Sequence, residues 1–227
     1  MKIKLLILLL VISVSACKKE EVSESPEQAP SAQAEPADSH TGAKRYQLES
    51  GKIEYKLSGG QSGTETLTFD RFGLREAKLV KSVIEFQGVK QNNHSISIFR
   101  DGKIITIDLN SNTGVEVTHP FAEMFNSEER VDLGEELLRQ MGGEKIGNDV
   151  VLGRPCQMWE IKQANTKTCL WKMIPLKAEA TFQNFTLHSV AVKIDESANV
   201  EESVFEIPKN VTIADTVGAP SLVESKE

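Results

Sequence analysis

The fold is decided by residues 51–70, GKIEYKLSGGQSGTETLTFD. In the first half of this stretch every second residue is apolar, so Ile53, Tyr55 and Leu57 share one face of an extended strand. In the second half Leu67 and Phe69 lie on one face and threonines on the other, after a break at two glycines. The stretch therefore predicts two neighbouring strands, each with one apolar face.

The same period-two alternation recurs along most of the chain. It predicts strands in residues 74–86, 95–98, 104–109, 115–117, 150–152, 156–161, 168–171, 176–182 and 186–194. The dipeptide Asp101-Gly102 lies between two of these runs and is a strong hairpin signal. Short strands joined by short turns favour an antiparallel meander.

Helical periodicity is confined to the middle of the chain. Residues 120–125 are long enough for a single turn, and residues 132–141 place four apolar side chains at helical spacing before a glycine pair. These four are Leu133, Leu137, Leu138 and Met141. The predicted fold is mainly β: an antiparallel, strongly curved sheet or unclosed β-barrel with one or two helices packed against it.

Two cysteines, Cys156 and Cys169, fall in neighbouring predicted strands that are separated by the polar stretch QANT. In an oxidising compartment this pair predicts a disulfide across a hairpin, and the alternative is two buried thiols. The chain has no CxxC motif, which disfavours a thiol oxidoreductase. The cysteine spacing also matches no zinc site.

The third cysteine, Cys17, ends a segment that begins with Lys2 and Lys4 and continues as a short apolar run. This order is typical of a secretory signal peptide, and the run is too short to span a bilayer as a helix. The ending Val14-Ser15-Ala16-Cys17 resembles the lipobox of bacterial lipoproteins. The resemblance implies that residues 1–16 are removed and that Cys17 carries acyl chains, palmitate among them; the alternative is an ordinary signal peptide with a chance cysteine.

Residues 17–44 follow as a lipidated cysteine and tether, because prolines, Ala, Ser and Glu dominate and cannot form a core. Residues 45–214 are predicted to be one β domain and residues 215–227 a disordered tail. By resemblance, Lys18 after the cysteine favours the inner leaflet of a Gram-negative outer membrane, with the domain in the periplasm. The formal net charge of -7 gives little reason to bind nucleic acid.

Three passages resemble the LolA/LolB-like superfamily of periplasmic lipoprotein carriers and their relatives. They are GKIEY (51–55) with GTETLTFD (63–70), CQMWE (156–160) with TCLWK (168–172) and IPLK (174–177), and VFEIPKNV (204–211) as a closing strand. The resemblance implies an unclosed barrel, capped by helices, with an apolar cavity for acyl chains or another apolar ligand. No residue matches the arginine that gates the cavity of the carriers.

Signals for catalysis, metals or cofactors are absent from the sequence. The four histidines (His40, His94, His119 and His188) have no ligand spacing, and neither a phosphate loop nor a nucleophile elbow is present. We therefore expect no enzyme activity and no cofactor. Trp159 and Trp171 are interpreted as core residues, with a cavity lining as the alternative.

Two functions remain as hypotheses. The first is a membrane-anchored periplasmic lipoprotein that binds a lipid or other apolar ligand in its barrel. The second is a structural or protein-interaction lipoprotein of the cell envelope with a filled barrel.

Overall fold

The computed structural model describes residues 42–86, 88–126, 132–182 and 185–214. All of them fall in one compact unit, His40–Glu227. The predicted signal peptide, Cys17, most of the tether and the tail lie outside the described residues. Ala43 and Lys44, which the sequence assigned to the tether, belong to the folded part, because Ala43 is buried and Lys44 bridges to Asp132.

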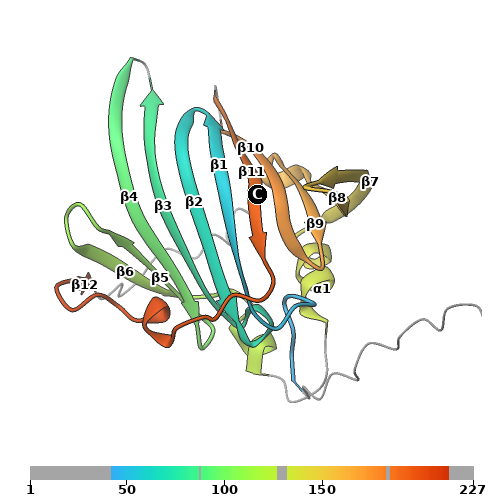
Figure 1. The fold of residues 1–227 in the computed structure, drawn as a ribbon, viewed down its shortest axis with the longest axis horizontal. Helices are drawn as coiled ribbons and strands as arrows, with labels where there is room; N and C mark the ends of the chain where they lie inside the picture. Colours follow the sequence, from blue (N-terminus) through green and yellow to red (C-terminus); the bar gives the residue numbers. More distant parts are fainter. Residues whose placement is uncertain (1–41, 87, 127–131, 183–184, 215–227) are drawn as a thin grey trace, which may run out of the picture. The chain divides into compact units, whose positions relative to one another are not determined.

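Twelve strands make up a single sheet (Figure 1). They are β1 (Gly51–Gly59), β2 (Gln61–Asp70), β3 (Arg75–Phe86), β4 (Val89–Arg100), β5 (Lys103–Asp108), β6 (Thr113–Thr118), β7 (Gly143–Val151), β8 (Arg154–Ile161), β9 (Thr166–Trp171), β10 (Ile174–Phe182), β11 (Phe185–Asp195) and β12 (Thr212–Ala214). Their order in the sheet is β12-β6-β5-β4-β3-β2-β1-β11-β10-β9-β8-β7.

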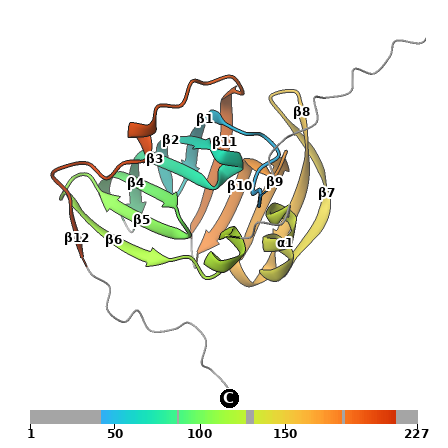
Figure 2. The ribbon, with the colours of Figure 1, turned by 90° about the horizontal axis from the view of Figure 1, so that it is seen from below.

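The sheet is strongly curled and does not close (Figure 2). All neighbouring strands pair antiparallel except β12, which runs parallel to β6. The predicted fold class is therefore confirmed.

One α-helix, α1 (Leu133–Gln140), occupies the predicted position, and Asp132 caps it by accepting from the Gly134 N–H at 3.2 Å. The other helical segments are short 3-10 turns: η1 (Arg71–Gly73), η2 (Ala122–Asn126), η3 (Lys162–Ala164) and η4 (Glu202–Phe205). None of the helices in the described parts of the chain has the length and apolar character needed to cross a membrane.

The two faces of the sheet are covered by different parts of the chain (Figure 2). On β4, Phe99 faces η2 and α1 inside the curl, whereas its neighbour Ile98 faces the C-terminal segment outside. Phe205 of η4 is 1% exposed and anchors that outer segment on β3, β4 and β5.

The predicted closing strand at 204–211 is wrong. Val204 and Phe205 belong to η4, and the strand that joins the sheet, β12, begins only at Thr212. The apolar side chains of this segment pack on the outer face instead of extending the sheet, and Pro208 has no N–H to donate to a strand ladder.

Candidate functional site

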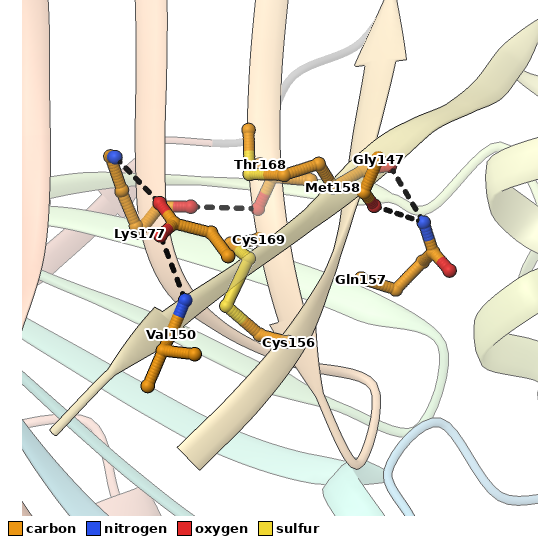
Figure 3. The surroundings of a disulfide bond; sticks show 9 residues. Gly147, Val150, Cys156, Gln157, Met158, Thr168, Cys169 and Lys177 are labelled. Carbon is orange, nitrogen blue, oxygen red and sulfur yellow. Dashed lines mark hydrogen bonds and ion pairs between the residues drawn. A yellow bond between two sulfur atoms is a disulfide. The ribbon is translucent and has the colours of Figure 1, made fainter. Parts of the chain in front are cut away.

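The predicted disulfide is present in the structure and joins β8 to β9 (Figure 3). Cys156 and Cys169 have Cα atoms 5.3 Å apart, and both side chains are buried in the largest core cluster beside Ile174 and Leu176. Met158 is the register partner of Cys169, so the bridge runs diagonally across the two strands. This burial indicates a structural bridge, since reactive cysteines are normally exposed.

The two tryptophans have different surroundings. Trp159 is 2% exposed and packs with Leu138 and Leu170, which confirms the interpretation as a core residue. Trp171 is half-buried, and the guanidinium of Arg154 lies 5.0 Å from its ring centre. The Trp159 cluster holds the C-terminal half of α1 against the inner face of the sheet.

A buried group of charges lies on the inner face at the centre of the sheet. Glu76 of β3 is the register partner of both Phe69 and Phe99, so its carboxylate enters the curl between aromatic side chains. The Tyr46 hydroxyl donates to Glu76 Oε2, and Lys78 Nζ lies 3.1 Å from Glu76 Oε1.

Arg45 completes this group. One of its terminal nitrogens lies 3.4 Å from Glu76 Oε2, and the other donates to the Gly73 carbonyl at 2.8 Å. The guanidinium also lies 4.5 Å from the ring centre of Phe99. Arg45 therefore fastens the segment that precedes β1 to the inner face of the sheet.

The neighbouring charges in this group shift the pKa values of its members. Burial alone would raise the pKa of Glu76, but the charges of Lys78 and Arg45 and the hydroxyl of Tyr46 outweigh it and lower the pKa to about 2. Burial and the Glu76 charge both raise the pKa of Tyr46 well above its ordinary value. At neutral pH the group thus holds two cations, one carboxylate and a neutral phenol.

A hollow of about 180 Å³ lies between this group and α1; we call it the α1 hollow. Its lining includes Arg45 and Lys78 from the charged group, Leu137 and Leu138 from α1, Met141 directly after α1, and Met173. Met141 is the most exposed apolar residue of this lining, at 41%. The α1 hollow thus combines an apolar wall with two cations.

A second hollow of about 390 Å³, the rim hollow, lies where η1, the β4–β5 turn, η2 and η4 meet. Its lining includes Arg71, Arg75, Arg100, Asp101, Glu202 and Glu206, with Leu74, Phe125 and Phe205 as the apolar part. Arg75 is fully engaged, since it bonds to Asp70 at 2.9 Å and to Glu202 at 2.8 Å. It clamps η4 onto β3.

Two of the four histidines have defined neighbours in the structure. His119 packs against Phe99 and Phe125, and His188 lies 3.5 Å from Glu179. In the described ranges, no three His, Cys, Asp or Glu side chains are grouped so that they could hold a metal ion. His40 and Cys17 lie outside those ranges.

No protein-family model matches the chain, and no curated protein matches it in sequence. Among solved structures, an uncharacterized conserved protein of Thermus thermophilus is similar, with a TM-score of 0.44 and 8% identity over 74% of this chain and 90% of that one. MucB, in a complex with periplasmic MucA, is similar with a TM-score of 0.38 and 10% identity, over 74% of this chain and 56% of that one. LprF of Mycobacterium bovis is similar with a TM-score of 0.30 and 9% identity, over 73% of this chain and 90% of that one. These scores are all below 0.5, so membership of the LolA/LolB-like superfamily stays a prediction.

The sequence did not identify Arg45, Glu76 and Lys78 as a site. A signal was present, because Glu76 and Lys78 continue the alternation of Val80 and Ile84 and so had to point to the same face of β3. A charge at an inward position of a strand is an exception that often marks function. Arg45 could not be found in this way, since it precedes the first strand.

Proposed function

We propose that this chain is a non-enzymatic, lipid-anchored protein of the bacterial envelope that binds an anionic amphiphile in the α1 hollow. The observation that carries the proposal is the union of apolar side chains on α1 with the cations Arg45 and Lys78 in one hollow. An acyl or other apolar chain would lie against Leu137 and Met141, and its carboxylate or phosphate would lie near Lys78.

The charge of the site supports an anion. Glu76 is ionised and offsets only one of the two cations. The other nearby carboxyl is Glu65, whose pKa is raised mainly by burial, with an opposing effect from Lys78. An anionic head group would meet Arg45 and Lys78 at a partly buried position, where an ion pair is stronger than in water.

Size sets a condition on this function. Small-molecule sites usually measure about 300–1,000 Å³, and the α1 hollow is smaller. A long chain therefore requires α1 to shift outward from its contacts with Trp159 and Leu170. Both halves of α1 are anchored, since Leu133 is 1% exposed and Leu138 is 9% exposed, so the shift has to break the packing of Leu138 on Trp159 and Leu170.

The test is native mass spectrometry with lipid extraction on protein purified gently from membranes. We expect one amphiphile per chain in the wild type and at least about tenfold lower occupancy in Met141→Gln and Lys78→Met. Val192→Gln, at a side chain 52% exposed on β11, and Lys81→Met, on the opposite face of β3 from Lys78, are the matched controls. Equal occupancy in all five proteins, or none in any, would contradict the proposal.

The anchor has its own test. We expect the mature chain to lack residues 1–16 and to carry acyl groups on Cys17, as read by intact-mass measurement. Cys17→Ser should release the protein from the membrane fraction without changing the binding of an added amphiphile. A wild-type chain without acyl groups would contradict the anchor while leaving the binding proposal intact.

The filled barrel is the second candidate function, and the small volume of the α1 hollow favours it. In that case the domain is a rigid platform for another envelope protein. Crosslinking in intact cells should then trap one dominant partner, and the purified protein should contain no amphiphile.

A further inference from the structure

Several charged side chains of the rim hollow have no ion pair with any described residue. Most basic side chains near the sheet ends have an acidic partner, as Arg75 has in Asp70 and Glu202. Arg71 has no ion pair with any described residue. Arg100 uses one terminal nitrogen on the Phe205 carbonyl at 3.2 Å, which leaves most of its donors unused among the described residues.

Two acids in the same lining are equally unpaired. Asp101 and Glu206 are exposed, and neither has a cationic partner among the described residues. Together with Arg71 and Arg100, these acids give the hollow positive and negative side chains that form no ion pair with one another.

Arg71 stands in a left-handed turn of the backbone. Arg71 has φ of 49° and is followed by Phe72 at 57°, in the left-handed region where Gly, Asn and Asp are the favourable residues. The turn itself has a structural cause, since the buried Phe72 carbonyl accepts from the N–H groups of both Arg45 and Tyr46. That cause requires a left-handed turn but gives no reason for an arginine in it.

The rim hollow is large enough for a small molecule and has a small apolar part. Its volume of about 390 Å³ falls within the usual range for small-molecule sites. Leu74 is half-buried and supplies most of the accessible apolar surface, because Phe125 and Phe205 in the same lining are buried.

We propose that the rim hollow is a binding site for a small zwitterion, in which an ammonium group and a carboxylate or phosphate flank a short apolar part. The anion lies between Arg71 and Arg100, and the ammonium faces Asp101 and Glu206. A bare anion meets the two acids and a bare cation meets the two arginines, so only a ligand with both charges uses the whole site. The site is separate from the α1 hollow and does not depend on the function proposed there.

Leucine and two analogues that each lack one charge give the direct test. The full chain, labelled with ¹⁵N, is titrated with leucine, 4-methylpentanoate (no ammonium) and 3-methylbutylamine (no carboxylate), and the amide signals of Arg71 and Gly102 are followed. We expect saturable shifts with leucine and at least about tenfold weaker binding of each analogue, because each leaves charged groups of the site without a partner.

Variants of the protein locate each charge. Arg71→Gln should weaken the binding of leucine about tenfold and leave the binding of 3-methylbutylamine unchanged. Asp101→Asn should weaken the binding of leucine and leave the binding of 4-methylpentanoate unchanged. Arg139→Gln, at an exposed arginine of α1, is the control for the loss of one positive charge. Equal weakening by Arg139→Gln would overturn the assignment.

Phosphoethanolamine distinguishes the two sources of such a ligand. Tighter binding of leucine assigns the site to amino acids or peptide ends, and tighter binding of phosphoethanolamine assigns it to a lipid head group. Inorganic phosphate or 4-methylpentanoate bound as tightly as the zwitterions, or no saturable shift with either zwitterion, would overturn the proposal.

Discussion

The two flanks of the curled sheet are fastened in different ways. At the β7–β9 flank the fastening is covalent and local, since Cys156 and Cys169 are 13 residues apart in sequence. At the β3–β5 flank it is non-covalent and distant, since Phe205 and Glu202 reach back to the sheet and the Arg75–Glu202 bond joins residues 127 apart. A reductant should therefore destabilise the first flank, and loss of buried apolar side chains should destabilise the second.

The largest effect is expected from Phe205→Ala. Removing this buried ring leaves a cavity over β3–β5 and should lower the free energy of unfolding by about 4 kcal/mol, as measured by denaturant titration. Hydrogen exchange should accelerate first in β4 and β5. Phe182→Ala, at a side chain 49% exposed, is the control and should cost far less. Equal losses in the two variants would contradict the role given to the C-terminal segment.

The double variant Cys156→Ser/Cys169→Ser tests the opposite flank. Loss of a bridge that closes so short a loop should lower the free energy of unfolding by about 3 kcal/mol. A reductant should bring the wild type to the stability of the variant and leave the variant unchanged. If exchange accelerates in β4 as much as in β8 and β9, the two flanks are not fastened independently.

The buried Glu76 of β3 should make the stability of the fold depend on pH. Because its pKa is about 2 in the folded chain against an ordinary value of 4.5, the unfolded chain binds the proton first as the pH falls. The Glu76 contribution is complete above about pH 4.5 and is lost toward pH 2, on the order of 3 kcal/mol in all. Thermal unfolding between pH 2 and 5 should show this slope in the wild type and a smaller slope in Glu76→Gln. The exposed Glu85→Gln serves as control and should retain the wild-type slope.

The smallest effect is expected from Arg71→Gly. Glycine adopts the left-handed conformation without a side-chain clash, so this variant should be more stable than the wild type by about 1 kcal/mol or less. The same variant should bind leucine at least about tenfold more weakly. A loss of stability would show that the arginine side chain supports the fold, contrary to its proposed role in binding.

Much of the fold could be predicted because several of its strands alternate apolar and polar residues. Ile53, Tyr55 and Leu57 proved to be buried on one face of β1, and the periodicity of α1 was visible in Leu133, Leu137 and Leu138. The packing of residues 204–211 on the outer face of the sheet was not predicted. Whether Phe205 packs on a face or joins an edge depends on long-range contacts, and the local pattern of residues 204–211 does not contain them.

The sites were harder to predict than the fold. The cysteine pair was found because two residues of a rare type fell in adjacent strands. The charges of the two hollows come from segments far apart in sequence, such as Arg45 with Lys78 and Arg71 with Arg100. Their grouping follows from the curl of the sheet, which no local pattern specifies.

The most direct test of the central claim is a fluorescence titration of Trp159, which packs under α1 with Leu138 and Leu170. The chain carries Trp171→Phe so that one tryptophan reports, and the ligands are laurate and dodecyltrimethylammonium below their micelle-forming concentrations. Laurate should change the Trp159 emission saturably, and the cationic amphiphile should bind at least about tenfold more weakly. This preference should be lost in Lys78→Met but kept in Lys81→Met. Equal binding of the two amphiphiles by the protein that retains Lys78, or no change in Trp159 emission with either, would contradict the central claim.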